Sequence, residues 1–275
     1  MQNLSNIPNW EIKETPLFAN FEIVEGYKAI TRSDNGKILH IAKKTYTPTP
    51  NGVFVETAKT LSNVTGYPLE MISEVEDGKK MLAFLKVTDP MRIAGNDFKE
   101  WLMIGNSHDG STGFFVGNSN MMIRCSNRFS KRFRMMQVYH TANHQERING
   151  IIDSFSDYRS QRSKFIDTLG EYIDFEIVDE QKKDLVNLIA EVTPEEIENP
   201  EKISTRKQNI ILDISQGIER ETKELGNNLF GLFNGVTFYT SHTRKDRQKV
   251  FNNALGSANE INQKAFNYCN HLINS

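Results

Sequence analysis

A histidine and an aspartate lie side by side in the segment NSHDGS, residues 106–111. Such a pair can bind a metal ion or serve as a general acid and base. Further ligands with metal-site spacing are scarce, because the chain has no HExxH motif and the pair His140 and His144 shares a face only if its segment is helical. The short polar side chains of NSHDGS can equally bond the backbone of a tight turn. We therefore expect Asn106, His108 and Asp109 to shape a loop, with ligand contact and catalysis as the alternatives.

A basic segment follows this loop, with five basic residues in eleven positions (124–134) and no acid among them. Arginine pairs with phosphates through its planar guanidinium, and aromatic rings give unpaired bases a surface for stacking. If the segment is helical, most of its cations share one side. The predicted nucleic-acid-binding residues are Arg124, Arg128, Lys131, Arg132 and Arg134, with the rings of Phe129, Phe133 and Tyr139. Asn127, within the segment, is expected to shape the adjoining loop.

The alternative reading of the basic segment is a solvated surface whose phenylalanines belong to the core. Phosphate contact is favoured because the formal net charge of the whole chain is only −2, so the local excess of cations stands out. A second basic stretch, HTRKDRQK at 242–249, is weaker because it includes an acid. The aromatic run at 227–242 has near-helical spacing and is better explained as core.

No nucleophile stands out in the sequence. Cys125 follows Arg124, which could lower a thiol pKa, but a cysteine at an apolar strand end is more often a small buried hydrophobe. The chain has no GxSxG, GxGxxG or GxxxxGK[ST] motif, so nothing indicates nucleotide hydrolysis. We expect no catalytic residue, no metal and no cofactor.

The bulk properties indicate a globular protein. A chain of 275 residues allows one large domain or two small ones, with a substantial core. Two distant cysteines indicate neither a disulfide framework nor a zinc site. The first residues lack the features of a signal peptide, and no apolar run reaches the roughly 20 residues that span a bilayer. We expect a cytoplasmic protein with no membrane partner.

The first half of the chain alternates as strands do. A hairpin is expected around Asp34–Gly36, then a helix over 53–64 that Asn51 could cap and Gly66 should end. The expected strands are 27–31, 38–41, one on each side of the turn at 76–79, 99–104, 112–116 and 121–123.

From about residue 141 the apolar spacing becomes helical. Residues 171–201 hold eleven acids and two lysines, a net charge of −9, and include the helix start TPEE at 193–196. The chain is thus predicted to be α+β, with an antiparallel sheet in the first half and a helical second half. The expected divisions are an N-terminal arm at 1–20, a β-rich core with a basic exit at 21–140, and a helical region at 141–275 with an acidic linker near 192–203.

Four motifs recur here in the order of a known family: YKAITRSDNGKIL…YTPTPN (27–51), NSHDGS, RCSN (124–127) and LFGLFNGVTFYTSH (229–242). On these motifs the chain resembles the phage/plasmid-like family known as domain of unknown function 932, over most of residues 20–260. It departs from the family at Arg124 and Arg128, where valine and threonine are usual, and at Phe230, where a tryptophan is expected. The second arginine strengthens the electropositive reading.

The resemblance implies residence on a phage, prophage or conjugative plasmid, and hence in a bacterial host, but it implies no reaction. The expected hairpin, meander and basic helix are also similar to the core of Rad52-type single-strand annealing proteins, which assemble as rings, an analogy at the level of fold. We therefore expect a non-catalytic, homo-oligomeric protein that binds or anneals single-stranded DNA in recombination or replication. The alternatives are an assembly or host-defence-blocking protein, and a metal-dependent nuclease using His108 and Asp109.

Overall fold

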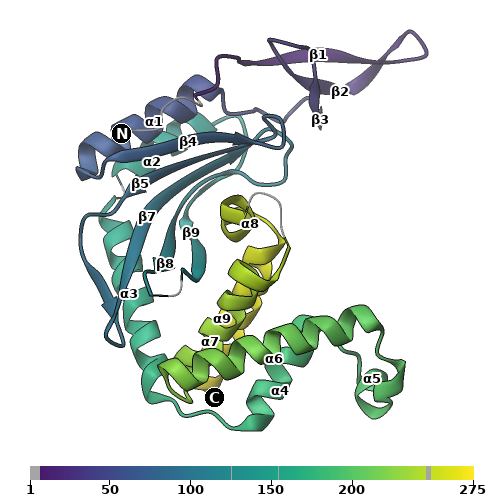
Figure 1. Cartoon of the computed structure of the whole chain (residues 1–275). Helices are drawn as coiled ribbons and strands as arrows, with labels where there is room; N and C mark the ends of the chain where they lie inside the picture. The colour runs from purple at the N-terminus through teal and green to yellow at the C-terminus, as the bar shows by residue number, and fades with distance from the viewer. Residues whose placement is uncertain (1–6, 125, 154, 246–248) are drawn as a thin grey trace. The chain divides into compact units, whose positions relative to one another are not determined.

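The computed structural model of the chain describes residues 7–275 except 125, 154 and 246–248, and it does not describe the side chains of 132–136, 155–157 and 249–250. Strands fill the first half and helices most of the second, which confirms the α+β class (Figure 1). The chain groups into two compact units. Unit 1 comprises Met1–Asp89, Glu100–Asn118 and Arg132–Gln161, and unit 2 comprises Pro90–Lys99, Ser119–Lys131 and Arg162–Ser275. The divisions predicted at residues 20 and 140, into an arm, a β-rich core and a helical region, stay predictions.

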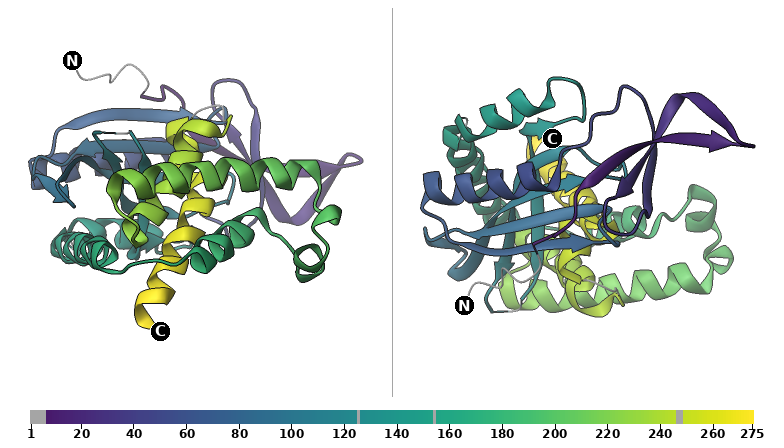
Figure 2. Two further views of the ribbon diagram at one scale, coloured as in Figure 1. Left: turned by 60° about the horizontal axis from the view of Figure 1, so that its bottom comes forward. Right: turned by 90° about the horizontal axis from the view of Figure 1, so that it is seen from above.

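A three-stranded antiparallel sheet opens the chain, in the order β1 (Ile12–Ala19), β2 (Glu22–Arg32) and β3 (Ile38–Lys43) (Figure 2, right). The β1–β2 turn places Asn20 and Phe21 at positive φ, as a two-residue hairpin turn requires. The first twenty residues, predicted to be an N-terminal arm, contribute the strand β1 (Ile12–Ala19). Pairing with the alternating residues of β2 makes that stretch a strand.

A second, six-stranded sheet has the order β4 (Leu69–Val75), β5 (Lys80–Lys86), β7 (Asn96–Ser107), β8 (Phe114–Met122) and β9 (Arg128–Val138), and β6 (Met91–Ile93) pairs with β7. The turn at 76–79 joins β4 to β5 as predicted. The stretches 112–116 and 121–123 were expected as two strands, but residues 114–122 form the single strand β8. The intervening GNSN reads as a turn in sequence, yet its asparagines Asn118 and Asn120 are buried within the strand.

The core of unit 1 lies between the sheet and helices α1 (Asn51–Thr65) and α2 (His144–Asp153). Phe54, Ala58 and Leu61 are fully buried at helical spacing on α1. Gly66 ends α1 at a φ of +72°, as predicted. The expectation that Asn51 caps this helix was wrong, because the carboxylate of Glu11 accepts the N–H groups of Asn51 and Gly52 instead.

The core of unit 2 is made largely by helices. They are α3 (Phe155–Asp174, which begins in unit 1), α4 (Asp179–Ala190), α5 (Pro194–Glu198), α6 (Thr205–Leu225), α7 (Leu229–Phe238), α8 (Lys249–Leu255) and α9 (Ser257–Asn274), with a 3-10 turn η2 (Pro200–Lys202) and a π-helical turn η3 (Tyr239–Thr243). The TPEE start is confirmed, since Thr193 and Glu196 form a reciprocal capping box around Pro194. Within the run at 227–242, residues 228–241 are buried apart from the half-buried Phe238, as expected for core. None of the helices in the described residues combines the length and apolar composition needed to cross a bilayer.

Candidate nucleic-acid interface

Residues 128–134 of the basic segment lie on β9, which ends the strand order of the larger sheet, and Arg124 precedes the strand. The helix considered for this segment is therefore wrong. Side chains from the C-terminal part of unit 2 satisfy the backbone at the start of the strand: Arg128 N–H donates to Ser241 Oγ (3.0 Å), while Asn262 Nδ2 donates to Arg128 O (3.2 Å) and Gln263 Nε2 to Ser130 O (2.9 Å). These bonds protect an edge that would otherwise expose unpaired groups, and they hold 128–130 extended.

Phe129 belongs to the core of unit 2. Its side chain is only 4% exposed, and its ring centroid lies 5.0–5.6 Å from those of Phe165, Phe233 and Phe266. Such aromatic clusters stabilise a core beyond the area that they bury. The core alternative therefore holds for Phe129, whose buried ring presents no face for stacking on a base.

Arg128 and Lys131 are half-buried cations on the same strand. Burial lowers the pKa of both side chains, because it disfavours their charged forms. The ammonium of Lys131 lies 4.7 Å from the ring centroid of Phe266 and 5.6 Å from that of Phe165, so ring faces stabilise part of its charge. Within the described part of the chain, neither cation has an ion pair with a carboxylate.

The other predicted contact residues have different surroundings. Arg124 is exposed and its Nη2 lies 3.1 Å from the carboxylate of Glu224, which compensates its charge. Tyr139 belongs to unit 1 and is 62% exposed. The side chains of Arg132, Phe133 and Arg134 lie outside the described residues, so their predicted roles stay predictions.

Asn127, predicted to shape a loop, lies in the connection from β8 to β9 and is buried. Its Nδ2 donates to the carbonyl of Asn234 (3.3 Å) on α7. Next to it, Ser126 adopts a φ of +57°. Asn127 of the RCSN motif therefore bonds to the NGVTFYTSH stretch, which also supplies Ser241 Oγ to the backbone N–H of Arg128. Two of the recurring motifs are thus joined by hydrogen bonds inside unit 2.

The NSHDGS segment ends β7 and turns toward β8 within unit 1. Thr112 N–H donates to Ser107 Oγ (3.0 Å), Ser111 N–H donates to Asp109 Oδ1 (2.9 Å), and Gly110 takes a φ of +73°. Although burial opposes it, the hydrogen bonds from Ser111 hold the pKa of Asp109 below its ordinary value. The short polar side chains thus close a tight turn.

Three buried histidines gather near this turn, a grouping that the spacing along the chain did not predict. His108 Nε2 donates to Asn51 Oδ1 (2.8 Å), His140 Nδ1 lies 3.4 Å from Thr49 Oγ1, and His144 Nδ1 donates to the carbonyl of Thr141 (2.9 Å). Each ring leaves its second nitrogen buried without a hydrogen-bond partner among the described residues. The recurrence of the YTPTPN and NSHDGS motifs together hinted at this grouping of side chains, since Thr49 and Asn51 belong to the first motif and His108 to the second.

Burial keeps two of these three histidines, His108 and His140, neutral. Burial, aided by the neighbouring imidazole of His140, lowers the pKa of His108 to about 4, and burial with His144 lowers that of His140 to about 4. No group of three or more histidines, cysteines, aspartates or glutamates that could hold a metal ion occurs among the residues described. His108 and His140 are therefore uncharged imidazoles inside unit 1.

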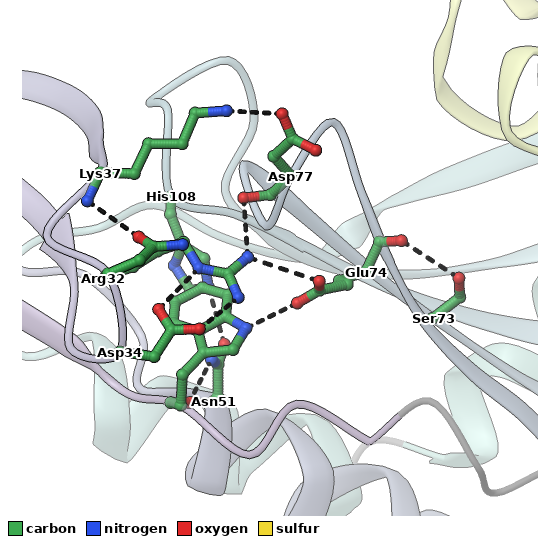
Figure 3. A network of polar contacts seen from close by, with 10 residues as sticks. Arg32, Asp34, Lys37, Asn51, Ser73, Glu74, Asp77 and His108 are labelled. Carbon is green, nitrogen blue, oxygen red and sulfur yellow. Dashed lines mark hydrogen bonds and ion pairs between the residues drawn. The ribbon is translucent and has the colours of Figure 1, made fainter.

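A polar network next to His108 ties the three-stranded sheet to the rest of unit 1 (Figure 3). The Arg32 guanidinium binds the Asp34 carboxylate through Nε (3.0 Å) and Nη2 (2.8 Å), reaches Glu74 (3.4 Å), and lies 4.1 Å from the ring centroid of Trp10. Trp10 Nε1 donates to Glu74 (2.6 Å), and its ring meets the His108 ring edge-on at 5.8 Å. Sequence reasoning missed this network, although a tryptophan in a polar stretch was a visible signal.

Comparison with known proteins identifies a family for most of the chain. A family model described as Domain of unknown function (DUF932) matches residues 38–261, well over half of the chain. No curated protein and no solved structure matches the chain.

Proposed function

The chain belongs to the DUF932 family, whose description assigns no function, and from the chemistry of its own residues we propose that it binds single-stranded nucleic acid without catalysis at the start of β9. The role proposed is that of a single-stranded DNA-binding or annealing protein in the recombination or replication of a phage or plasmid. Its working form would be a homo-oligomer.

The observation that carries the proposal is the pair of half-buried cations, Arg128 and Lys131. A partly desolvated charge is costly unless a charge of opposite sign or hydrogen bonds offset that cost. Because no carboxylate in the described chain offsets these two, a bound anion is the natural complement, and the phosphates of nucleic acid supply one for each cation.

The geometry of the strand predicts that Arg128 and Lys131 contribute separately to phosphate binding. Residues three apart on a strand are about 10 Å from each other, and their side chains leave it on opposite sides. Arg128 and Lys131 are therefore expected to contact different phosphates and to act independently.

Fluorescence anisotropy with labelled oligothymidylate, measured across salt concentrations, tests this proposal. Wild-type affinity should fall steeply with salt, and Arg128→Gln and Lys131→Gln should each reduce the slope of log affinity against log salt by about 0.7 and weaken binding roughly tenfold. Lys131→Arg, which keeps the charge, should retain most of the affinity. Lys202→Gln is the matched control, because it removes the same charge from a lysine paired with Glu195 on a different element.

Two outcomes would end the proposal: binding that does not depend on salt, or wild-type affinity in the Arg128→Gln/Lys131→Gln double variant. Fluorescence assays of strand pairing would then separate annealing from simple binding. Cleavage of the oligonucleotide with Mg²⁺ or Mn²⁺ would favour the nuclease alternative, and a defined oligomer without any nucleic-acid binding would favour the assembly or host-defence alternative.

A further inference from the structure

The three-stranded sheet exposes an unusual amount of apolar surface. Phe21, at the tip of the β1–β2 hairpin, is fully exposed (100%), and Phe18 beside it is 59% exposed. Ile23, Tyr27, Ile38 and Ile41 are also exposed large hydrophobic residues of this sheet. Single exposed hydrophobic side chains need no explanation, but a contiguous group of them marks an interaction site.

Strand register places part of this group on one face. Ile41 is opposite Ala29 and Ile38 is opposite Thr31. Tyr27 shares their face because residues 27, 29 and 31 lie two apart on β2. The reverse face carries Ile30 and Ala42, which are buried in the structure. The sheet therefore has apolar side chains on both faces, whereas a sheet with one solvated face usually carries polar residues there.

The base of the three-stranded sheet is anchored within unit 1. β2 ends at Arg32, whose ion pairs with Asp34 and Glu74 and stacking on Trp10 anchor the base of the sheet (Figure 3). Phe21 lies at the opposite end of the same strand pair, on the hairpin turn. The apolar tip is thus presented on an anchored hairpin, which lowers the conformational cost of using it in a contact.

We infer that this sheet is a self-association surface, which packs face to face on the same sheet of a second copy of the chain. We name it the hairpin surface, comprising Phe18, Phe21, Ile23, Tyr27, Ile38 and Ile41. At roughly 100 Å² for each of these partly exposed side chains, the hairpin surface offers about 600 Å² of apolar area. A stable interface buries about 800 Å² on each partner, so these six residues with their polar rim approach what a dimer needs.

The charges of the sheet favour a second copy over a partner of opposite charge. Residues 12–43 contain five basic and four acidic residues, so the surface is close to neutral. A neutral surface can face an identical one without strong repulsion, as a two-fold symmetric contact requires. Two sheets packed in this way interdigitate their facing side chains.

Measurement of mass by light scattering across protein concentrations, with the full chain, tests the surface. The wild type should associate, and Phe21→Glu/Ile41→Glu should raise the dissociation constant by roughly a hundredfold or more, since each interface would bury an unpaired charge. Leu212→Glu is the control, because Leu212 is similarly exposed (54%) on α6, outside the hairpin surface. A wild type that stays monomeric, or a double variant that associates as the wild type does, would overturn the inference.

A photo-crosslinking residue at position 27, in a mixture of isotopically labelled and unlabelled chains, locates the contact. Crosslinks between the two chains within residues 12–43 support the sheet-to-sheet mode, and crosslinks to any other segment overturn it. Phosphatidylcholine vesicles with a tenth of anionic lipid are a second probe. If the wild type is monomeric in solution and binds these vesicles, and Phe21→Glu does not bind them, the surface contacts a membrane and the inference is overturned. The inference rests on the homo-oligomer of the proposed function, for which it names the contact surface. It fails separately from nucleic-acid binding, because Lys131→Gln should weaken that binding and leave the mass unchanged.

Discussion

Lowering the pH from 7 to 5 should destabilise unit 1 through its buried histidines. The pKa of His108 and that of His140 are held at about 4 by burial, with a neighbouring imidazole adding to the effect. In the unfolded chain both return to about 6.5. Because the folded pKa is the lower one, the unfolded state binds more protons, and stability falls from about pH 6.5 downward until about pH 4.

The size of this effect follows from the two pKa values. A displacement from about 6.5 to about 4 is worth about 3 kcal/mol per histidine once the pH is below both, and about 2 kcal/mol at pH 5. His108 and His140 together should therefore cost about 4 kcal/mol between pH 7 and pH 5. That is a large part of the stability of an ordinary domain, which is about 5–15 kcal/mol.

Urea unfolding followed by tryptophan fluorescence measures the effect, because both tryptophans, Trp10 and Trp101, belong to unit 1. His108→Gln and His140→Gln should each remove about half of the difference between pH 7 and pH 5, whatever their effect on stability at pH 7. His271→Gln, at an exposed position on α9, is the control and should leave the difference intact. An unfolding free energy that is constant over this range, or that changes equally in all variants, would refute the reasoning.

Three further outcomes are expected. Gly235→Ala should lower the free energy of unfolding by about 2 kcal/mol or more, because a Cβ there would lie 2.4 Å from the Cα of Ile218. Gly170→Ala on α3 is the control: its Cβ would meet nothing within 4 Å, and it should stabilise the protein by up to about 1 kcal/mol. Thermal melts in which the two variants behave alike would contradict the packing. Arg32→Met should cost about 2–3 kcal/mol, since it strips two carboxylates of their cation, and should speed amide hydrogen exchange throughout β1–β3, with unchanged exchange as the opposing result. Cys269 is fully buried, and burial raises the pKa of its thiol, so iodoacetamide should modify it only in denaturant; peptide mass mapping that found it alkylated in the folded protein would disagree.

Signals that act within a few residues could be read from the sequence. Gly66 ends a helix because it can take positive φ, and Thr193 with Glu196 starts one because the two side chains cap each other. The basic segment shows where such reasoning stops. Its cations follow helical spacing, but a strand also suits the segment, because Phe129 and Lys131 lie two apart and share one face while Arg128 lies on the other. Hydrogen bonds from residues more than a hundred positions away select the strand.

The site was predictable only in part for the same reason. The cations of β9 could be named because they stand out in composition, whereas their burial depends on helices far along the chain. The stack of Arg32 on Trp10 and the approach of His108 to Asn51 join segments with unrelated local patterns. No periodicity encodes these contacts, and only the recurrence of motifs in one order hinted that they belong together.

The interleaving of the two units has a practical consequence for dissecting the protein. β7, β8, β9 and α3 each begin in one unit and end in the other. A single cut in the backbone therefore cannot release either unit intact, because each unit is built from three separate stretches of the chain. Limited proteolysis should yield nicked chains that stay together, and point substitutions rather than deletions are the means to separate what each unit contributes.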